Sequence, residues 1–186
     1  MYLNRAAMIE KQPLELNADF QYALDAIEKH RKNIFITGRA GTGKSTLLQL
    51  FRSATRKKTV VLAPTGIAAL NVGGQTIHSF FGFPPKYLQR SEINKRRDRR
   101  LYNNLDILII DEISMVRADM LDNIDYFLRL NRENPLPFGG VQVVFFGDLF
   151  QLPPVVNSNS PEMQLFQSHY ESPYFFSARV MEEFEM

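Results

Sequence analysis

Residues 38–45 combine glycines, a lysine and a hydroxyl at a spacing that can bind phosphate. They fit the pattern G-x-x-x-x-G-K-[ST]. Glycines let the backbone curl so that successive N–H groups point at an anion, and the start of the following helix adds partial positive charge. We therefore predict a nucleotide-binding phosphate loop rather than an ordinary glycine-rich turn. Its candidate contacts are Gly38, Arg39, Ala40, Gly41, Thr42, Gly43, Lys44, Ser45 and Thr46.

Four polar side chains have specific roles in this chemistry. Lys44 would reach the β- and γ-phosphates and Ser45 would be a magnesium ligand. Asp111 closes an apolar run and suits a second magnesium contact, while Glu112 follows it directly. Adjacent side chains point in different directions, so one carboxylate can face a metal and the other a water molecule. A hydrolase needs such a water base and a small-molecule kinase does not, so the pair favours ATP hydrolysis. Two solvated acids in a loop are the alternative.

Gln151 is a candidate sensor of the terminal phosphate. It follows the last apolar run, and its amide can donate to a phosphate and accept from water. A glutamine before two prolines can also simply cap a turn. Its position beside the other run ends favours the catalytic interpretation.

Four apolar runs must position these residues, at 33–37, 59–63, 105–110 and 141–146. Helical or mixed segments separate them, which predicts an α/β, doubly wound domain with a mostly parallel sheet and helices on both faces. Ligands bind such sheets at the carboxyl ends of the strands. The polar clusters at 38–45, 64–66, 111–112 and 148–151 all follow a run, so we expect them to meet there.

The segments between the runs predict several helices. Asn17 can cap a helix that carries Phe20, Leu24 and Ile27 on one face. Short helices are expected at 66–71 and after Thr76, and a longer one should bury Met120, Ile124, Phe127 and Leu128. We expect a surface excursion at 82–104, a loop at 131–140, and a long polar segment at 155–173.

Composition indicates one globular domain. The chain has 186 residues, 45% hydrophobic, with no cysteine for disulfides or thiolate metal sites. No apolar run is long enough to span a membrane, and residues 1–12 lack a signal-peptide core. We expect a cytoplasmic protein, with a bacterial cytoplasm or nucleoid favoured and a nucleus or mitochondrion left open. Net charge is only +2, but seven basic residues cluster at 86–100, either as a polyanion contact or as a solvated loop.

Five motifs in order resemble a known family. Residues 38–45, 63–69, 76–80, 111–115 and 147–154 are similar to motifs I, Ia, Ib, II and III of the petite-integration-frequency DNA helicases, which are RecD-like members of superfamily 1B. The resemblance implies a RecA-like P-loop NTPase fold and ATP with Mg²⁺ as cofactors. It also implies 5′ to 3′ movement along single-stranded DNA and separation of duplexes at junctions.

The resemblance also implies a DNA track. Hydroxyls and exposed N–H groups can hold phosphates, and rings can stack on bases without reading sequence. The alternative is that Phe80 or Phe81 belongs to the core and that His78 is structural. The candidate contacts are Pro64, Thr65, Gly66, Thr76, His78, Ser79, Phe80, Lys95, Arg96 and Arg97.

Two departures from the family pattern concern the ends of the chain. Gln21 is the candidate adenine contact, although Phe20 competes for the same position. The chain ends at Met186, where the family continues into a second RecA-like domain with arginine fingers. We therefore expect an extension at 1–15, one RecA-like domain at 16–186, and a linked second domain in a monomeric parent protein.

Two other functions stay open on the sequence. One is a P-loop small-molecule kinase, which transfers phosphate to a metabolite. The other is a non-enzymatic, nucleotide-gated module that binds single-stranded DNA. Phosphate release tested with DNA and with small acceptors distinguishes the three.

Overall fold

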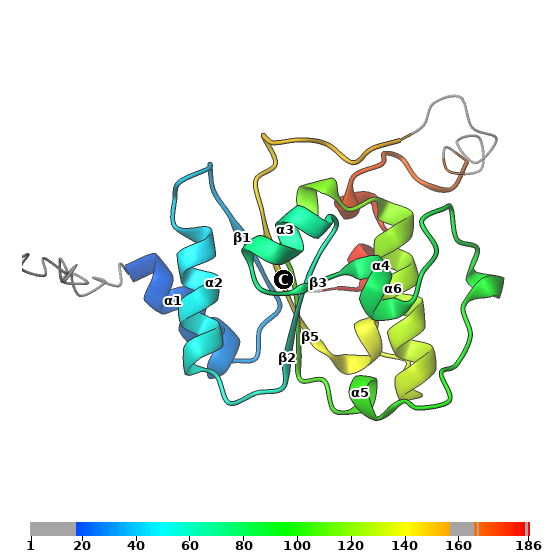
Figure 1. The fold of residues 1–186 in the computed structure, drawn as a ribbon, viewed down its shortest axis with the longest axis horizontal. Coiled ribbons are helices and arrows are strands. Elements are labelled where there is room, and N and C mark those ends of the chain that lie inside the picture. Colours follow the sequence, from blue (N-terminus) through cyan, green and yellow to red (C-terminus); the bar gives the residue numbers. More distant parts are fainter. Residues whose placement is uncertain (1–17, 157–165, 167, 185) are drawn as a thin grey trace, which may run out of the picture.

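The computed structural model describes residues 18–156, 166, 168–184 and 186, and a parallel sheet runs through the middle of this part of the chain (Figure 1). The strands are β1 (Ile34–Thr37), β2 (Thr59–Ala63), β3 (Gln75–Thr76), β4 (Ile107–Ile110) and β5 (Gln142–Gly147). Their order is β1-β5-β4-β2-β3, and every neighbouring pair is parallel. The predicted α/β class with a parallel sheet is confirmed.

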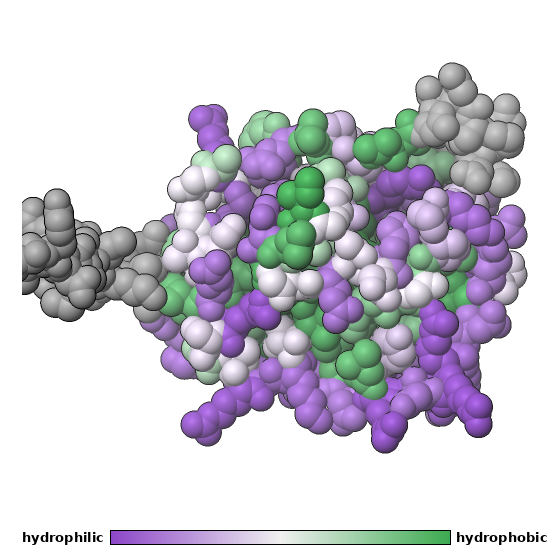
Figure 2. Space-filling model, in the orientation of Figure 1, coloured by the Kyte–Doolittle hydropathy of each residue, from purple (hydrophilic) through white to green (hydrophobic). Residues whose placement is uncertain are grey.

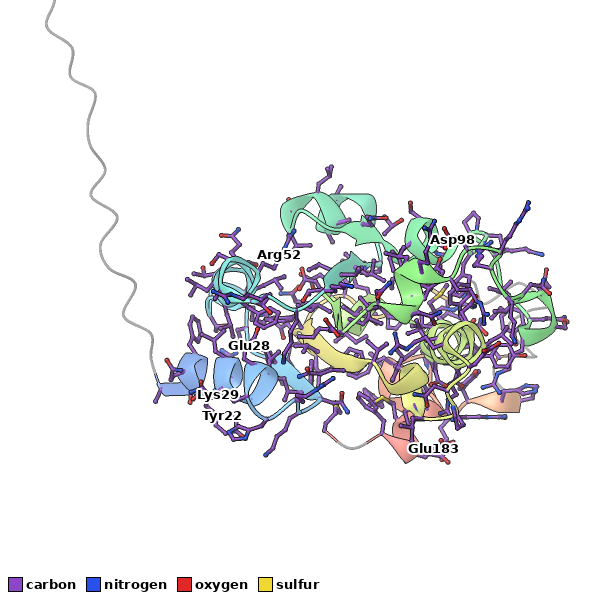
Figure 3. All side chains as sticks on the ribbon, turned by 90° about the horizontal axis from the view of Figure 1, so that it is seen from below. Tyr22, Glu28, Lys29, Arg52, Asp98 and Glu183 are labelled. Atoms are coloured by element: carbon purple, nitrogen blue, oxygen red, sulfur yellow. The ribbon has the colours of Figure 1, made fainter. Side chains whose placement is uncertain are left out.

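Helices cover both faces of the sheet. In Figure 1, α1 (Ala18–Glu28) and α2 (Lys44–Ala54) lie on one side and α6 (Ala118–Arg132) on the other, and Figure 3 shows the same arrangement from below. The shorter helices and turns are α3 (Gly66–Asn71), α4 (Ile77–Phe81), η1 (Arg90–Glu92), α5 (Arg100–Asn103), η2 (Ile113–Met115), η3 (Pro137–Gly140), η4 (Phe175–Ser177) and α8 (Val180–Glu183). None of the described helices is long and apolar enough to cross a membrane.

The domain has two hydrophobic cores, one on each face of the sheet, and the strand sequences explain both. Successive side chains of a strand point to opposite faces, so a strand buried on both faces is apolar throughout. In β4, Ile107 and Ile109 pack with α1 and α2, whereas Leu108 and Ile110 pack with α6. The sheet therefore separates two hydrophobic layers.

A cation on α2 ties the helix after the phosphate loop to the segment after α3. Arg52 points from α2 towards that segment (Figure 3), and its guanidinium donates to the carbonyl oxygens of Val72 and of Gly73, the latter at 3.2 Å. Two segments that follow different strands are thus bonded to each other.

Most predicted elements are confirmed. The helix at 66–71 is α3, and Thr76 caps α4 by accepting from the backbone N–H of Ser79 at 3.1 Å. The sequence did not predict β3, because two polar residues carry no apolar pattern. The helix α6 continues two residues into the expected loop at 131–140. Asn17 and part of 155–173 lie outside the described residues.

The surface excursion at 82–104 is only partly as predicted. Phe83, Leu88, Ile93 and Tyr102 are each no more than 7% exposed and belong to the core on the α6 face. They are scattered among charges with no helical or strand period, so the pattern did not indicate their burial. The segment is an irregular cover over α6.

Candidate nucleotide site and the adjoining groove

The order of the strands brings three predicted clusters to one edge. β5 lies between β1 and β4, and Thr37 pairs with Gly147 while Ile110 pairs with Phe145, so the three strands end at nearly the same level. Neighbouring strands are about 4.8 Å apart, which puts the ends of β1 and β4 about 10 Å from each other. The segment with Gln151 leaves β5 between them. A nucleoside triphosphate is long enough to span the carboxyl ends of these three strands.

The phosphate loop has the backbone that anion binding requires. Gly41 and Gly43 have φ values of 82° and 89°, and α2 starts at Lys44. A Cβ at Gly41 would meet no atom within 4 Å, so the loop is open there. The Lys44 amine donates to the carbonyl oxygen of Gly38 and to that of Arg39 at 3.1 Å. Backbone N–H groups, a helix start and an ammonium group therefore meet in one place, which fits a bound phosphate chain.

The carboxylate pair sits on strained backbone. Glu112 has φ 52° and ψ 45°, a left-handed conformation that is uncommon for residues other than glycine. Such strain persists only where surrounding structure imposes it, and it is frequent at functional sites.

Electrostatics connects this pair to the phosphate loop. The pKa of Asp111 is raised to about 6, chiefly by burial and next by the negative charge of Glu112. The backbone N–H of Glu112 and the positive charge of Lys44 act in the opposite direction. The charges of Lys44 and Asp111 therefore interact across β5, as a shared nucleotide and metal site requires.

We expect Asp111→Asn to stabilise the metal-free chain near neutral pH. The pKa of Asp111 is about 6 in the folded chain against an ordinary 3.8, so between these values the folded chain keeps a proton that the unfolded chain has lost. Stability therefore falls as pH rises from about 4 to above 6, by on the order of 1–2 kcal/mol after solvent screening. Urea unfolding in EDTA should show the variant more stable at about pH 7.5 and equal to wild type at about pH 4. An equal difference at both pH values would contradict the shift.

Gln151 lies in the turn after β5, where its side chain is held by Asp148. The amide nitrogen Nε2 donates to Asp148 Oδ2 at 3.2 Å, and the Gln151 backbone N–H donates to the Asp148 carbonyl oxygen at 3.1 Å. Gln151 itself is exposed at the carboxyl edge of the sheet. The turn follows β5, which lies between β1 and β4, and the role of Gln151 stays a prediction.

The two candidates for adenine contact differ in position. The ring of Phe20 lies against the phosphate loop, because a Cβ added to Gly43 would meet its Cζ at 2.8 Å. Gln21 is exposed, and its Nε2 donates to Asp25 Oδ1 at 3.0 Å. Both belong to the first turns of α1, so the adenine role of Gln21 stays a prediction.

A groove of about 350 Å³ joins the segments after β2 and β3. Thr65 and Thr76 cap α3 and α4 by accepting from backbone N–H groups at 3.2 and 3.1 Å, which leaves each hydroxyl its O–H to donate. The Nδ1 of His78 lies 3.3 Å from the Phe83 carbonyl oxygen. The groove is lined by Pro64, Thr65, Ile77, His78, Pro85, Lys86, Tyr87, Met115, Val116, Arg117, Met120 and Val155.

Phe80 does not join this groove. It is 7% exposed, and its ring makes edge contacts with Phe81 and Tyr102. Phe81 is fully buried. The stacking of Phe80 on a base is therefore wrong for this structure, because α4 turns the ring into the core. Gly66 and Ser79 are exposed beside the two capping threonines.

The basic segment is mostly engaged within the protein. Lys95 pairs with Glu133 at 2.9 Å. Arg96 donates to the Phe81 carbonyl oxygen, and its guanidinium carbon lies 5.6 Å from the centre of the Phe127 ring. Arg96 is thus a structural residue and not the free phosphate contact that the sequence predicted. Arg97 is exposed and stays a candidate for DNA contact.

Arg96→Ala is expected to lower the free energy of unfolding by about 1–3 kcal/mol, because a cation–π contact and a charged hydrogen bond are lost. Arg97→Ala is the matched control, and we expect it to change stability by no more than about 0.5 kcal/mol. Chemical denaturation of both variants measures the difference. Equal stabilities of the two variants would contradict the structural role of Arg96.

Comparison with known proteins agrees with the geometry. The model of the family described as PIF1-like helicase matches residues 15–182. This chain belongs to the PIF1-like helicase family. It is 40% identical over 169 residues to the ATP-dependent DNA helicase PIF1 of Saccharomyces cerevisiae, covering 85% of this chain and 20% of that protein. It is 40% identical over 142 residues to human ATP-dependent DNA helicase PIF1, covering 74% and 22%.

Solved structures of the PIF1-like family have the same fold. The Pif1 helicase from Bacteroides in complex with ADP-AlF3 and ssDNA is 41% identical with a TM-score of 0.84, covering 92% of this chain and 41% of that chain. This chain therefore has the RecA-like fold of these helicases. It spans about a fifth of the two curated relatives and about two fifths of the solved chain.

The structure adds features to the PIF1-like site that sequence reasoning missed. Asp148 is 4% exposed at the end of β5, and the pattern of the motif gave no role to its carboxylate. Lys86 and Tyr87 line the groove, and the sequence pattern assigned no role to the Tyr87 ring.

Figure 2 shows apolar surface gathered over α3, where Ile67 and Leu70 are exposed. Exposure of aliphatic side chains has no signal in sequence, because the same residue types form cores.

Proposed function

We propose that this chain is the ATPase domain of an ATP-dependent DNA helicase that couples hydrolysis to 5′ to 3′ movement along single-stranded DNA. One observation carries the proposal: the phosphate loop, the turn with Gln151 and the Asp111–Glu112 pair follow three neighbouring strands. The complex of Bacteroides Pif1 with ADP-AlF3 and ssDNA supports it.

Residues 38–46 would hold the nucleotide. Their backbone N–H groups and the Lys44 ammonium suit the phosphates, and Gln21 would contact adenine. Ser45 and Asp111 would hold Mg²⁺. The ion, when bound, screens the negative charge of the phosphates. No three His, Asp or Glu side chains among the described residues form a metal site, so the phosphate oxygens would complete the coordination of the ion.

Glu112 and Gln151 would act on the water. The Glu112 carboxylate can accept a proton from a water that attacks the γ-phosphate. The Gln151 amide can donate to that phosphate and accept from the same water. The Lys44 ammonium would oppose the negative charge that develops on the phosphate.

The groove and its rim would contact the DNA backbone. Thr65 and Thr76 can donate their O–H groups to phosphates, and Pro64, Gly66, His78 and Ser79 lie beside them. Lys95 and Arg97 add positive charge. Contacts of this kind do not read base sequence, which suits a motor that moves along any strand.

The parent protein would complete the motor. We propose that a linked second RecA-like domain supplies an arginine to the γ-phosphate and the other half of the DNA track. The parent would act as a monomer at duplex junctions in the bacterial cytoplasm or nucleoid. The isolated chain should bind ATP but hydrolyse it slowly, since an arginine finger contributes about 10³–10⁵ to the rate.

Phosphate release by this chain, with and without oligo(dT) and with a panel of small phosphate acceptors, tests the proposal. We expect slow release and DNA binding that responds to ATP. Transfer to a small acceptor would identify a kinase instead. ATP-responsive DNA binding without turnover, even after the rest of the parent is supplied, would identify a nucleotide-gated clamp.

A further inference from the structure

The carboxylate of Asp148 is buried at the point where β5 ends. Asp148 is 4% exposed. Its Oδ1 accepts from the Phe150 backbone N–H at 3.0 Å, and its Oδ2 accepts from Gln151 Nε2 at 3.2 Å. One side chain therefore organises both the turn and the glutamine in it.

No cation accounts for this burial. Among the residues that the structure describes, no lysine, arginine or histidine forms an ion pair with Asp148; its side chain is bonded only to Phe150 and Gln151. A buried carboxylate is costly unless hydrogen bonds satisfy it. An asparagine could accept from the Phe150 N–H equally well, so the cap alone does not require an acid.

A carboxylate differs from an amide in that it only accepts. Gln151 must therefore turn its nitrogen towards Asp148 and its oxygen Oε1 away. One amide hydrogen is used by Asp148, and the second hydrogen and Oε1 stay available. These are a donor for a phosphate oxygen and an acceptor for a water hydrogen.

We propose that Asp148 is a positioning residue that sets the orientation of the Gln151 amide for recognition of the γ-phosphate. The inference rests on the proposed role of Gln151 at that phosphate. With asparagine at position 148, the side-chain oxygen would keep the bond from the Phe150 N–H, and the amide nitrogen would take the place of Oδ2. That nitrogen only donates, so Gln151 could bond to it only by turning Oε1 towards it. The donor and the acceptor that Gln151 presents to the phosphate and the water would then be exchanged.

Nucleotide discrimination in this chain tests the inference. The affinities for Mg·ATP and Mg·ADP are measured by displacement of a fluorescent ADP from wild type, Asp148→Asn, Gln151→Ala and the double variant. We expect Gln151→Ala to reduce the preference for ATP about tenfold and Asp148→Asn to reduce it at least about threefold. The double variant should equal Gln151→Ala, because Asp148 acts through Gln151.

Asp106→Asn is the matched control. Asp106 Oδ2 accepts from the Lys58 backbone N–H at 2.9 Å, beside the amino end of β4, so the same chemical change is made away from the site. Its ATP preference should equal that of wild type. Two results would overturn the inference. One is that Asp148→Asn lowers the ATP preference by the same factor in the Gln151→Ala background as in wild type. The other is that Gln151→Ala lowers the preference and Asp148→Asn does not. No effect of Gln151→Ala would instead remove the proposed role of Gln151.

The hydrogen bond between Gln151 and Asp148 can also be tested by NMR on the wild-type chain, without any variant. In ¹H–¹⁵N spectra, one side-chain amide proton of Gln151 should be shifted by the hydrogen bond to Asp148, unlike the amides of exposed glutamines such as Gln49. Shifts of the two Gln151 protons equal to those of a free glutamine would overturn the inference.

Discussion

Glu112→Gln is expected to slow single-turnover ATP hydrolysis by at least about 100-fold, since a positioned general base contributes about 10²–10⁴ to a rate. Glutamine keeps the size of the side chain but cannot take up the proton of the attacking water. Phosphate release from ATP, with the chain in excess over nucleotide, measures the loss. Affinity for Mg·ATP should stay within about threefold of wild type, because Glu112 is not assigned to phosphate binding.

Glu133→Gln is the matched control for this experiment. Glu133 has φ 53° and ψ 41°, almost the backbone of Glu112, but it ends α6 and pairs with Lys95 and Arg99. The control should hydrolyse ATP at the wild-type rate. If Glu112→Gln also did so, Glu112 would not be the base, and the preference for hydrolysis over phosphoryl transfer would lose its main support.

Lys44→Ala is expected to weaken binding of ATP by about 100-fold or more. Hydrogen bonds to charged groups are worth about 1.5–3 kcal/mol each, and the ammonium group would serve two phosphates. Displacement of a fluorescent nucleotide measures the affinity. Lys44 is also bonded to the Gly38 and Arg39 carbonyl oxygens, so circular dichroism should first show that the variant keeps the helix content of wild type.

Lys57→Ala is the control for Lys44→Ala. It shows how much ATP affinity is lost when a lysine that only bonds to the backbone is removed. Lys57 also donates to two carbonyl oxygens, those of Ile27 and Glu28, at 2.9 and 3.0 Å. We expect the control to lose stability and to keep its ATP affinity within about twofold. ATP affinity of Lys44→Ala equal to that of the control would contradict the phosphate role of Lys44.

Local patterns were enough to predict most elements of this domain and to single out the residues of its candidate nucleotide site. Apolar runs of β-branched and aliphatic residues gave the main strands, and glycines before Lys44 gave the loop. Thr76 was recognised as a helix cap because capping depends on residues three apart. Each of these signals is confined to a few neighbouring residues.

Two errors came from residues whose partners are distant in the chain. The Phe80 ring is buried against Tyr102, and the Arg96 guanidinium lies over Phe127. The type of a residue does not reveal whether an aromatic ring or a guanidinium contacts solvent or other side chains of the protein. Only the packing of α4 and of the 82–104 segment on α6 decides between these outcomes.

Sequence motifs alone predicted the parts: a phosphate loop, an acidic pair after one strand and a glutamine after another. They could not determine that β5 would lie between β1 and β4, because strand order depends on which apolar faces pack together across the whole chain. That order puts the turn with Gln151 after a strand that lies between the strands followed by Lys44 and by Glu112. It also left Asp148 buried beside Gln151, an arrangement of two polar groups that only a folded chain reveals.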